Sequence, residues 1–192
     1  LLADPDHPRL VRRVTAPALS RNVVDNIQRK IEPEVKKLFY KLGQPETFDY
    51  IADVANHIPF ISITRMVGIP EKYWPDIKQV ILTFTETWNP TISDEQRESA
   101  RQDSNRAIDI IRQVIAERRE APEQDDFLST LLKIEAQHEG FEEGDIVTLI
   151  LALIGAGADT TLVAQQWSVY CLLKHKDQAA RALASPEAFS NA

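Results

Sequence analysis

The segment LILALIGAGADTTLVAQQW, from Leu149 to Trp167, constrains the fold of this chain more than any other. Its apolar residues recur at helical spacing, yet its centre contains Gly155, Gly157 and the polar run Asp159 to Thr161. A glycine inside a helix costs about 1 kcal/mol relative to alanine, and polar groups amid apolar neighbours need partners. Residues that disfavour the helix in which they lie, or that place polar groups in an apolar segment, often mark a functional site.

The apolar run around this segment predicts a core helix rather than a membrane span. Its longest uncharged stretch, Ile146 to Ala158, ends at Asp159, whereas about 20 apolar residues are needed to cross a bilayer. The chain has 192 residues, of which 43% are hydrophobic and 27% charged, with a net charge of −7. This composition is typical of a globular protein, and its acidic balance argues against nucleic acid as a partner. We therefore expect a cytoplasmic protein with neither a membrane nor a nucleic-acid partner.

Helical periodicity recurs along the rest of the chain and predicts an all-α architecture around one long central helix. Gly43 is placed to end one helix, and Ser93, followed by acidic residues, is placed to begin another. The expected helices cover Pro8 to Ser20, Asn22 to Leu42, Phe48 to Val67 with an interruption at Pro59, Tyr73 to Trp88, Ser93 to Arg119, Asp125 to His138, Glu142 to Lys174 and Asp177 to Leu183.

On the central helix, Ala156, Gly157 and Thr160 are expected to share one stripe, because residues three and four apart lie on one face. Their small side chains predict a shallow notch for a flat ligand, with the Thr160 hydroxyl beside it. Asp159 lies about 100° around the helix axis from Thr160. From this position its carboxylate can supply protons to the notch without contacting the ligand. The alternative is structural: small residues allow close helix packing, and the hydroxyl bonds to the Ala156 carbonyl. An unpaired carboxylate amid apolar residues favours the functional interpretation.

The motif AGADTT, Ala156 to Thr161, stands in order with three other segments: DPDHPRLVRRVTAPALS and DDFLSTLLKI before it, and LLKHKDQAARALASPEAF after it. AGADTT matches the (A/G)-G-x-(D/E)-T-(T/S) signature of helix I in the cytochromes P-450. The other segments resemble helix C, the approach to helix I and the segment that follows it. The chain thus resembles the central part of a soluble bacterial-type cytochrome P-450, from helix C to about helix J.

The resemblance implies a haem-thiolate monooxygenase that uses haem b, dioxygen, a small organic substrate and an electron donor of the ferredoxin or flavodoxin type. By resemblance, Thr160 would hold a distal water and hydrogen-bond to oxygen, while Asp159 relays protons. Ala156 and Gly157 would border the haem. The segment from Trp74 to Trp88 would form part of the lid over the substrate.

The helix C segment departs from the family pattern, which places a histidine and an arginine four residues apart to bind the haem propionates. Here Val11 follows His7 by four residues and Arg12 follows it by five. Aligning RRVTAPALS with the family assigns the propionate role to Arg12 and displaces His7 by one residue. Arg12 and His7 are the cofactor contacts that the resemblance implies, and the alternative is a solvated basic turn.

A larger departure concerns the axial ligand, because the family's E-x-x-R and F-x-x-G-x-x-x-C-x-G patterns do not occur here. Cys171, the one cysteine, lies 11 residues beyond Thr160, or about 16 Å along the same helix. One nearly straight helix cannot supply both sides of a haem, so Cys171 is expected to be a small buried hydrophobe. We expect residues 1–192 to be the middle of a longer domain and, without the thiolate, to lack monooxygenase activity alone.

Two other interpretations remain open. An all-α isoprenoid synthase is suggested by DDFLS, Asp125 to Ser129, because such enzymes bind Mg²⁺-diphosphate through D-D-x-x-D. Here Ser129 replaces the third carboxylate. The other interpretation is a non-catalytic helical binding module, in which Asp159 and Thr160 have no chemical role.

Overall fold

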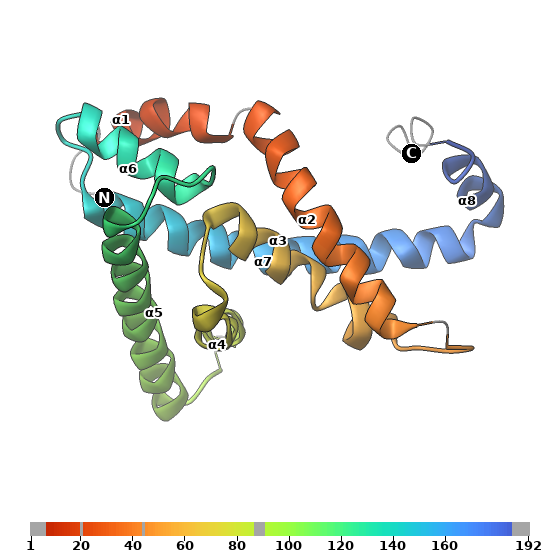
Figure 1. The fold of residues 1–192 in the computed structure, drawn as a ribbon. Helices are drawn as coiled ribbons and strands as arrows, with labels where there is room; N and C mark the ends of the chain where they lie inside the picture. Colours follow the sequence, from red (N-terminus) through yellow and green to blue (C-terminus); the bar gives the residue numbers. More distant parts are fainter. Residues whose placement is uncertain (1–6, 20, 44, 87–90, 186–192) are drawn as a thin grey trace.

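Helix α7, Glu143–Lys174, runs through the middle of the molecule, and the other helices are arranged along it (Figure 1). The computed structural model describes residues 7–19, 21–43, 45–86 and 91–185, and every regular element in these ranges is helical. The predicted all-α architecture is therefore confirmed. Helices α1, α5 and α6 gather at the N-terminal end of α7, whereas α8 lies at its other end.

The described residues form α-helices joined by short helical turns. The α-helices are α1 (His7–Thr15), α2 (Arg21–Leu42), α3 (Ile58–Val67), α4 (Trp74–Glu86), α5 (Asp94–Glu120), α6 (Phe127–Gln137), α7 and α8 (Lys176–Ala182). The turns are η1 (Ala16–Leu19), η2 (Ile51–Ala55) and η3 (Glu71–Tyr73).

Prolines account for the two largest changes to the expected helices; most other expected boundaries differ by one or two residues. The helix expected to reach Ser20 ends at Thr15 and continues as η1, because Pro17 has no N–H to donate to the helix; Ser20 itself lies outside the described residues. The helix expected over Phe48 to Val67 is divided into η2 and α3. Pro59 lies in the first turn of α3, where its missing N–H is not needed. The expected helix end at Trp88 also lies outside the described residues.

Local capping explains where two long helices begin or end. Ser93 accepts a hydrogen bond from the Gln96 backbone, and Gln96 accepts one in return from the Ser93 backbone, at 3.2 and 2.9 Å. This reciprocal capping satisfies backbone donors that the first turn of α5 leaves unpaired. Gly43 ends α2 with a φ of 72°, a conformation that glycine adopts without strain. Both predicted caps are confirmed.

The core lies on the N-terminal half of α7, where α3, α5 and α6 pack against it. Its fully buried members include Ile146, Ile150, Ile154, Ile111, Ile115, Leu128 and Leu131. The C-terminal half of α7 instead exposes 62% of Trp167 and 71% of Leu173. The prediction of a core helix thus holds for one half of α7 only, since the described helices cover little of the other half. By length and composition alone, α7 is also apolar enough to cross a membrane.

A buried ionic cluster joins α3, α5 and α6 at one end of the core. Arg118 Nη1 donates to both carboxylate oxygens of Asp126, at 2.6 and 2.5 Å, and to Ser129 Oγ at 2.9 Å. Its Nη2 donates to the carbonyl of Gly68 at 2.8 Å. Asp126 also caps α6 by accepting from the Ser129 backbone at 2.9 Å. The cluster satisfies two buried charges with several hydrogen bonds, which is the condition under which buried ions are tolerated.

Gly68 is required at this cluster by its conformation and by its neighbour. It has a φ of 88°, which favours glycine, and a Cβ at this position would collide with the Asp126 carboxylate.

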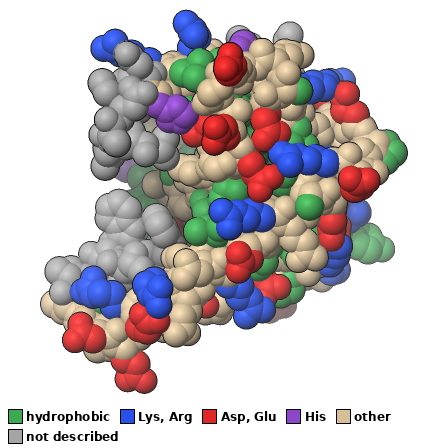
Figure 2. Space-filling model, turned by 90° about the vertical axis from the view of Figure 1, so that its left-hand side faces the viewer, with side chains coloured by type: hydrophobic (Ala, Val, Ile, Leu, Met, Phe, Trp, Pro, Cys, Tyr) green, Lys and Arg blue, Asp and Glu red, His purple; other side chains and the backbone are tan. Residues whose placement is uncertain are grey.

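The surface of the molecule carries both signs of charge. Figure 2 shows Lys and Arg side chains interspersed with Asp and Glu on one face of the molecule, without a continuous basic patch on that face.

Candidate functional site

The centre of α7 presents Ala156 and Thr160 on an exposed face, one helical turn apart. The Thr160 hydroxyl donates to the Ala156 carbonyl oxygen at 2.6 Å. This is the local bond that the sequence allowed, and it occupies the hydroxyl proton while leaving lone pairs on Oγ1 that can accept a hydrogen bond. Ala152 and Ala164 are exposed one turn before and one turn after this pair, so the face is flat as well as open.

Gly157 lies on a different side of α7 from the one that we expected. A Cβ at Gly157 would lie 3.2 Å from Ile63 Cδ1 of α3, so the glycine permits close packing of α3 on α7. The expectation that it shares an open stripe with Ala156 and Thr160 is therefore wrong. Neighbouring positions differ by about 100° around a helix, and α3 occupies the side on which Gly157 falls.

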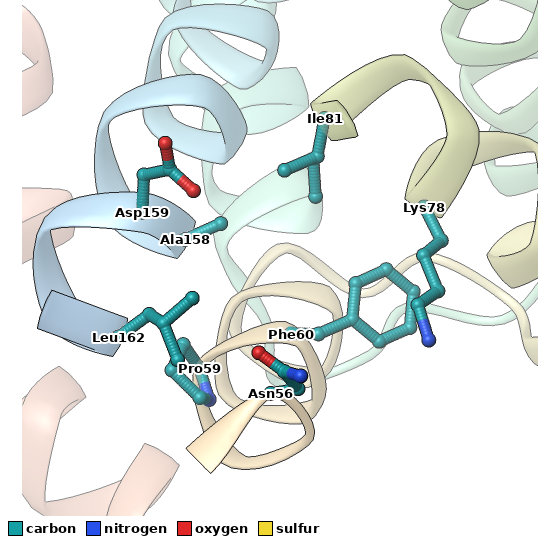
Figure 3. A pocket seen from close by; sticks show the side chains of 8 residues that line it. All are labelled: Asn56, Pro59, Phe60, Lys78, Ile81, Ala158, Asp159 and Leu162. Atoms are coloured by element: carbon teal, nitrogen blue, oxygen red, sulfur yellow. The ribbon is translucent and has the colours of Figure 1, made fainter. Parts of the chain in front are cut away.

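Asp159 lines a small cavity of about 160 Å³ between α3, α4 and α7. Figure 3 shows its carboxylate beside the space that Ile81 and Phe60 border, with Asn56 and Lys78 on the opposite side. Asp159 is half-buried, and within the described part of the chain it makes no ion pair or hydrogen bond. The carboxylate thus lies at the wall of a small, partly apolar cavity without a partner among the described residues. Sequence reasoning missed Asn56 and Lys78, because nothing in their local sequence indicates proximity to Asp159.

A second cavity, of about 420 Å³, lies between α4, α5 and α7. Among the described residues that line it, only Ser104 and Thr148 carry polar side chains. Both hydroxyls already donate to carbonyl oxygens of their own helices, Ser104 to Ala100 and Thr148 to Gly144, each at 2.8 Å. The apolar lining includes Val80, Ile81, Ile108, Leu151, Ala152 and Ile154. The described walls therefore offer no charge and no free hydroxyl donor to a ligand.

The η3 turn that precedes α4 is fixed against α5 by an ionic contact. Tyr73 Oη donates to Glu117 Oε1 at 2.7 Å, and Lys72 Nζ donates to the same oxygen at 2.7 Å. Burial raises the pKa of the Tyr73 phenol, and the hydrogen bond to Glu117 adds to the increase. The contact joins the segment before α4 to the C-terminal part of α5.

The structure does not bring His7 to the same place as Asp159. His7 Nε2 lies 2.7 Å from Asp145 Oδ1, in the first turn of α7, and Asp145 precedes Asp159 by about 21 Å of helix. Arg12 is exposed on α1 and lies about 140° around that helix from His7. The two residues that the resemblance implies as cofactor contacts therefore face different surroundings.

Cys171 is exposed on α7, so the expectation of a buried cysteine is wrong. It lies on the C-terminal half of the helix, which the described elements cover only sparsely. Within the described ranges, no group of three or more His, Cys, Asp or Glu side chains is placed to hold a metal ion. The isoprenoid synthase interpretation requires both aspartates of DDFLS to bind a metal ion. Asp126 is instead paired with Arg118, and of the two only Asp125 is exposed.

Comparisons with known proteins identify one family. The cytochrome P450 family model matches residues 1–184. Cytochrome P450 CYP107DY1 of Priestia megaterium is 28% identical over 180 residues, which are 91% of this chain and 41% of that protein. The polyketide biosynthesis cytochrome P450 PksS of Bacillus subtilis is 27% identical over 192 residues, which are 98% of this chain and 45% of that protein.

Solved structures show the same fold. Epothilone B-bound cytochrome P450epoK superposes with a TM-score of 0.83 at 22% identity, over 96% of this chain and 47% of that one. P450BioI, in complex with an acyl carrier protein that carries hexadec-9Z-enoic acid, superposes with a TM-score of 0.82 at 24% identity, over 96% of this chain and 47% of that one. The chain thus spans less than half of the length of the relatives that it matches.

Proposed function

Because the chain belongs to the cytochrome P450 family, we propose that it is the central part of a haem-dependent monooxygenase that inserts one oxygen atom of dioxygen into a small organic substrate. The observation that carries the proposal is the pairing of Asp159 and Thr160 on α7. Asp159 lines a small cavity on one side, while Thr160 lies on an open, flat face on the other. The chain therefore joins a proton source to a surface on which a cofactor can lie.

The residues on that face fit one side of a haem. Ala156 and Thr160 are exposed and small, so a planar group can approach the backbone of α7. Arg12 is exposed on α1 and would pair with a propionate, because guanidinium binds carboxylates well. The haem b that the family uses would supply the activation of dioxygen. Cys171 lies on the helix that carries Thr160, so the thiolate that the family uses would come from another segment.

Protons would reach this face through the Asp159 cavity. The Asp159 carboxylate has no partner among the described residues, so it can take a proton from water in the cavity beside Asn56 and Lys78. The Thr160 hydroxyl already donates to the Ala156 carbonyl, so its lone pairs are free to hold a water on the open face. Asp159 would act as the acid and Thr160 would place the water that receives the proton.

The cavity between α4, α5 and α7 would bind the substrate. It extends along α7 to Gly155, about 7 Å of helix before Thr160. The described walls carry no charge, which favours a hydrocarbon part of the substrate, since a buried charge without a partner is costly. Relatives named for polyketide biosynthesis and for epothilone C/D epoxidation are consistent with an organic substrate. We further propose a cytoplasmic location and an electron donor of the ferredoxin or flavodoxin type.

Filling the cavity between α4, α5 and α7 should weaken substrate binding. Ala152→Phe places a ring in the space between α5 and α7, and we expect the affinity for uncharged apolar ligands to fall about tenfold, or 1.4 kcal/mol. Calorimetric titration with an alkane-chain alcohol and with the carboxylate of the same length measures the effect. Ala116→Phe is the matched control, because Ala116 is exposed on α5 outside the cavity. Equal binding by Ala152→Phe and the wild type would contradict this assignment.

The full-length gene product tests the function as a whole. We expect it to bind haem stoichiometrically and, with a reducing partner, to consume dioxygen and form a product that is one oxygen atom heavier than the substrate. Mass spectrometry with ¹⁸O₂ measures the incorporation. A coding sequence that continues into F-x-x-G-x-x-x-C-x-G would supply the thiolate. Failure of the full-length product to take up haem would overturn the proposal.

A further inference from the structure

One carboxylate in the first turn of α7 is shared between two helices. Asp145 Oδ2 accepts a hydrogen bond from the Glu142 backbone at 3.0 Å, as part of the cap of α7. Its other oxygen, Oδ1, lies 2.7 Å from His7 Nε2 at the start of α1. The Asp145 side chain is 9% exposed and the His7 side chain 27% exposed. Since bonds to an ionised group in a partly buried place are stronger than neutral ones, this bond can order both segments.

Apolar packing also holds helix α1 in place. Val11 and Val14 enter the core, and the backbone of α1 packs on α6. Apolar contacts are not directional, so they allow a helix to slide or rotate slightly. A hydrogen bond at the first residue of α1 removes that freedom and fixes the direction in which exposed Arg12 points.

We infer that His7 is a positioning residue, which anchors α1 to α7 through Asp145 and does not contact the cofactor. The distances support this role. Asp145 precedes Ala156 by about 16 Å of helix, so the His7 side chain is bound well away from the face proposed for the cofactor. Arg12 lies on a different side of α1 and carries a permanent charge. The role of Arg12 rests on the proposed function, whereas the anchoring role of His7 does not.

Hydrogen exchange of the full-length protein tests the anchor directly. We expect His7→Ala to speed amide exchange in α1 and in the first turn of α7 about fivefold, the factor that corresponds to one hydrogen bond of ordinary strength. His7→Gln should restore slow exchange, because its amide N–H can donate to Asp145 from a similar position. Arg13→Ala, an exposed change on α1, should have no effect. A purely steric role for His7 would not be rescued by glutamine in this way.

A double-mutant cycle separates the pair from the cap. Asp145→Ala also removes the acceptor for Glu142, but this loss is common to both arms of the cycle and cancels. We expect the effects of His7→Ala and Asp145→Ala on exchange to be strongly non-additive. Additive effects would overturn the inference.

Haem titration then assigns the cofactor contact. We expect Arg12→Ala to weaken haem retention about tenfold without a change in α1 exchange, and His7→Gln to retain haem like the wild type. If His7→Gln loses haem as Arg12→Ala does, while α1 exchange stays slow, His7 binds the cofactor and the inference is wrong. If the wild type binds no haem, the proposed function fails, yet the exchange measurements still decide the anchor.

Discussion

Replacing Thr160 with alanine should separate dioxygen consumption from product formation in the full-length protein. We expect the product formed per dioxygen consumed to fall about fivefold, since one hydrogen bond of ordinary strength contributes about 1 kcal/mol. Without the hydroxyl, water on the open face of α7 is no longer held, and electrons appear in hydrogen peroxide instead of product. Simultaneous measurement of dioxygen, peroxide and product gives the ratio.

Three variants define what the Thr160 result means. Thr160→Ser keeps a hydroxyl that can bond to the Ala156 carbonyl, so coupling should stay close to that of the wild type. Thr161→Ala changes the neighbouring exposed threonine and should leave coupling unaltered. Asp159→Asn should lower turnover about 100-fold, because the amide cannot act as an acid. Unchanged coupling in Thr160→Ala would exclude the proposed relay and favour a non-catalytic role for the motif.

Replacing Arg118 with methionine should destabilise the fold by about 3–5 kcal/mol, because it leaves the Asp126 carboxylate buried and unpaired. The side chains of both residues are only 6% exposed, so water cannot replace the guanidinium. Chemical denaturation monitored by circular dichroism measures the loss. Arg119→Ala is the matched control: its ion pairs with Glu135 and Glu143 lie at the surface and should contribute less than about 1 kcal/mol.

The partner variant tests whether the charge itself is responsible. Asp126→Ser removes the carboxylate but keeps a side chain that can cap α6. We expect Arg118→Met combined with Asp126→Ser to be more stable than Arg118→Met alone, because no unpaired charge remains buried. A double variant that is less stable than Arg118→Met would show that packing, and not charge, dominates at this site.

Local sequence was sufficient to predict the elements of this fold. Apolar spacing indicated α7 and most of the other helices, and the caps at Gly43 and Ser93 were predicted from residue type alone. These features depend on interactions within about four residues, which a sequence displays directly. The AGADTT motif also indicated where a site would lie, because glycine and polar residues conflict with an apolar helix at that point.

The partners of these residues were decided only by the tertiary structure. Gly157 meets Ile63 of α3, and His7 meets Asp145, although 138 positions separate the latter pair. Nothing near Lys78 or Asn56 in sequence relates them to Asp159. Which side of a helix is covered depends on where other helices pack, and that placement results from the burial of the whole core. Sequence therefore determined the helices and the place of the motif, while packing determined which side chains meet.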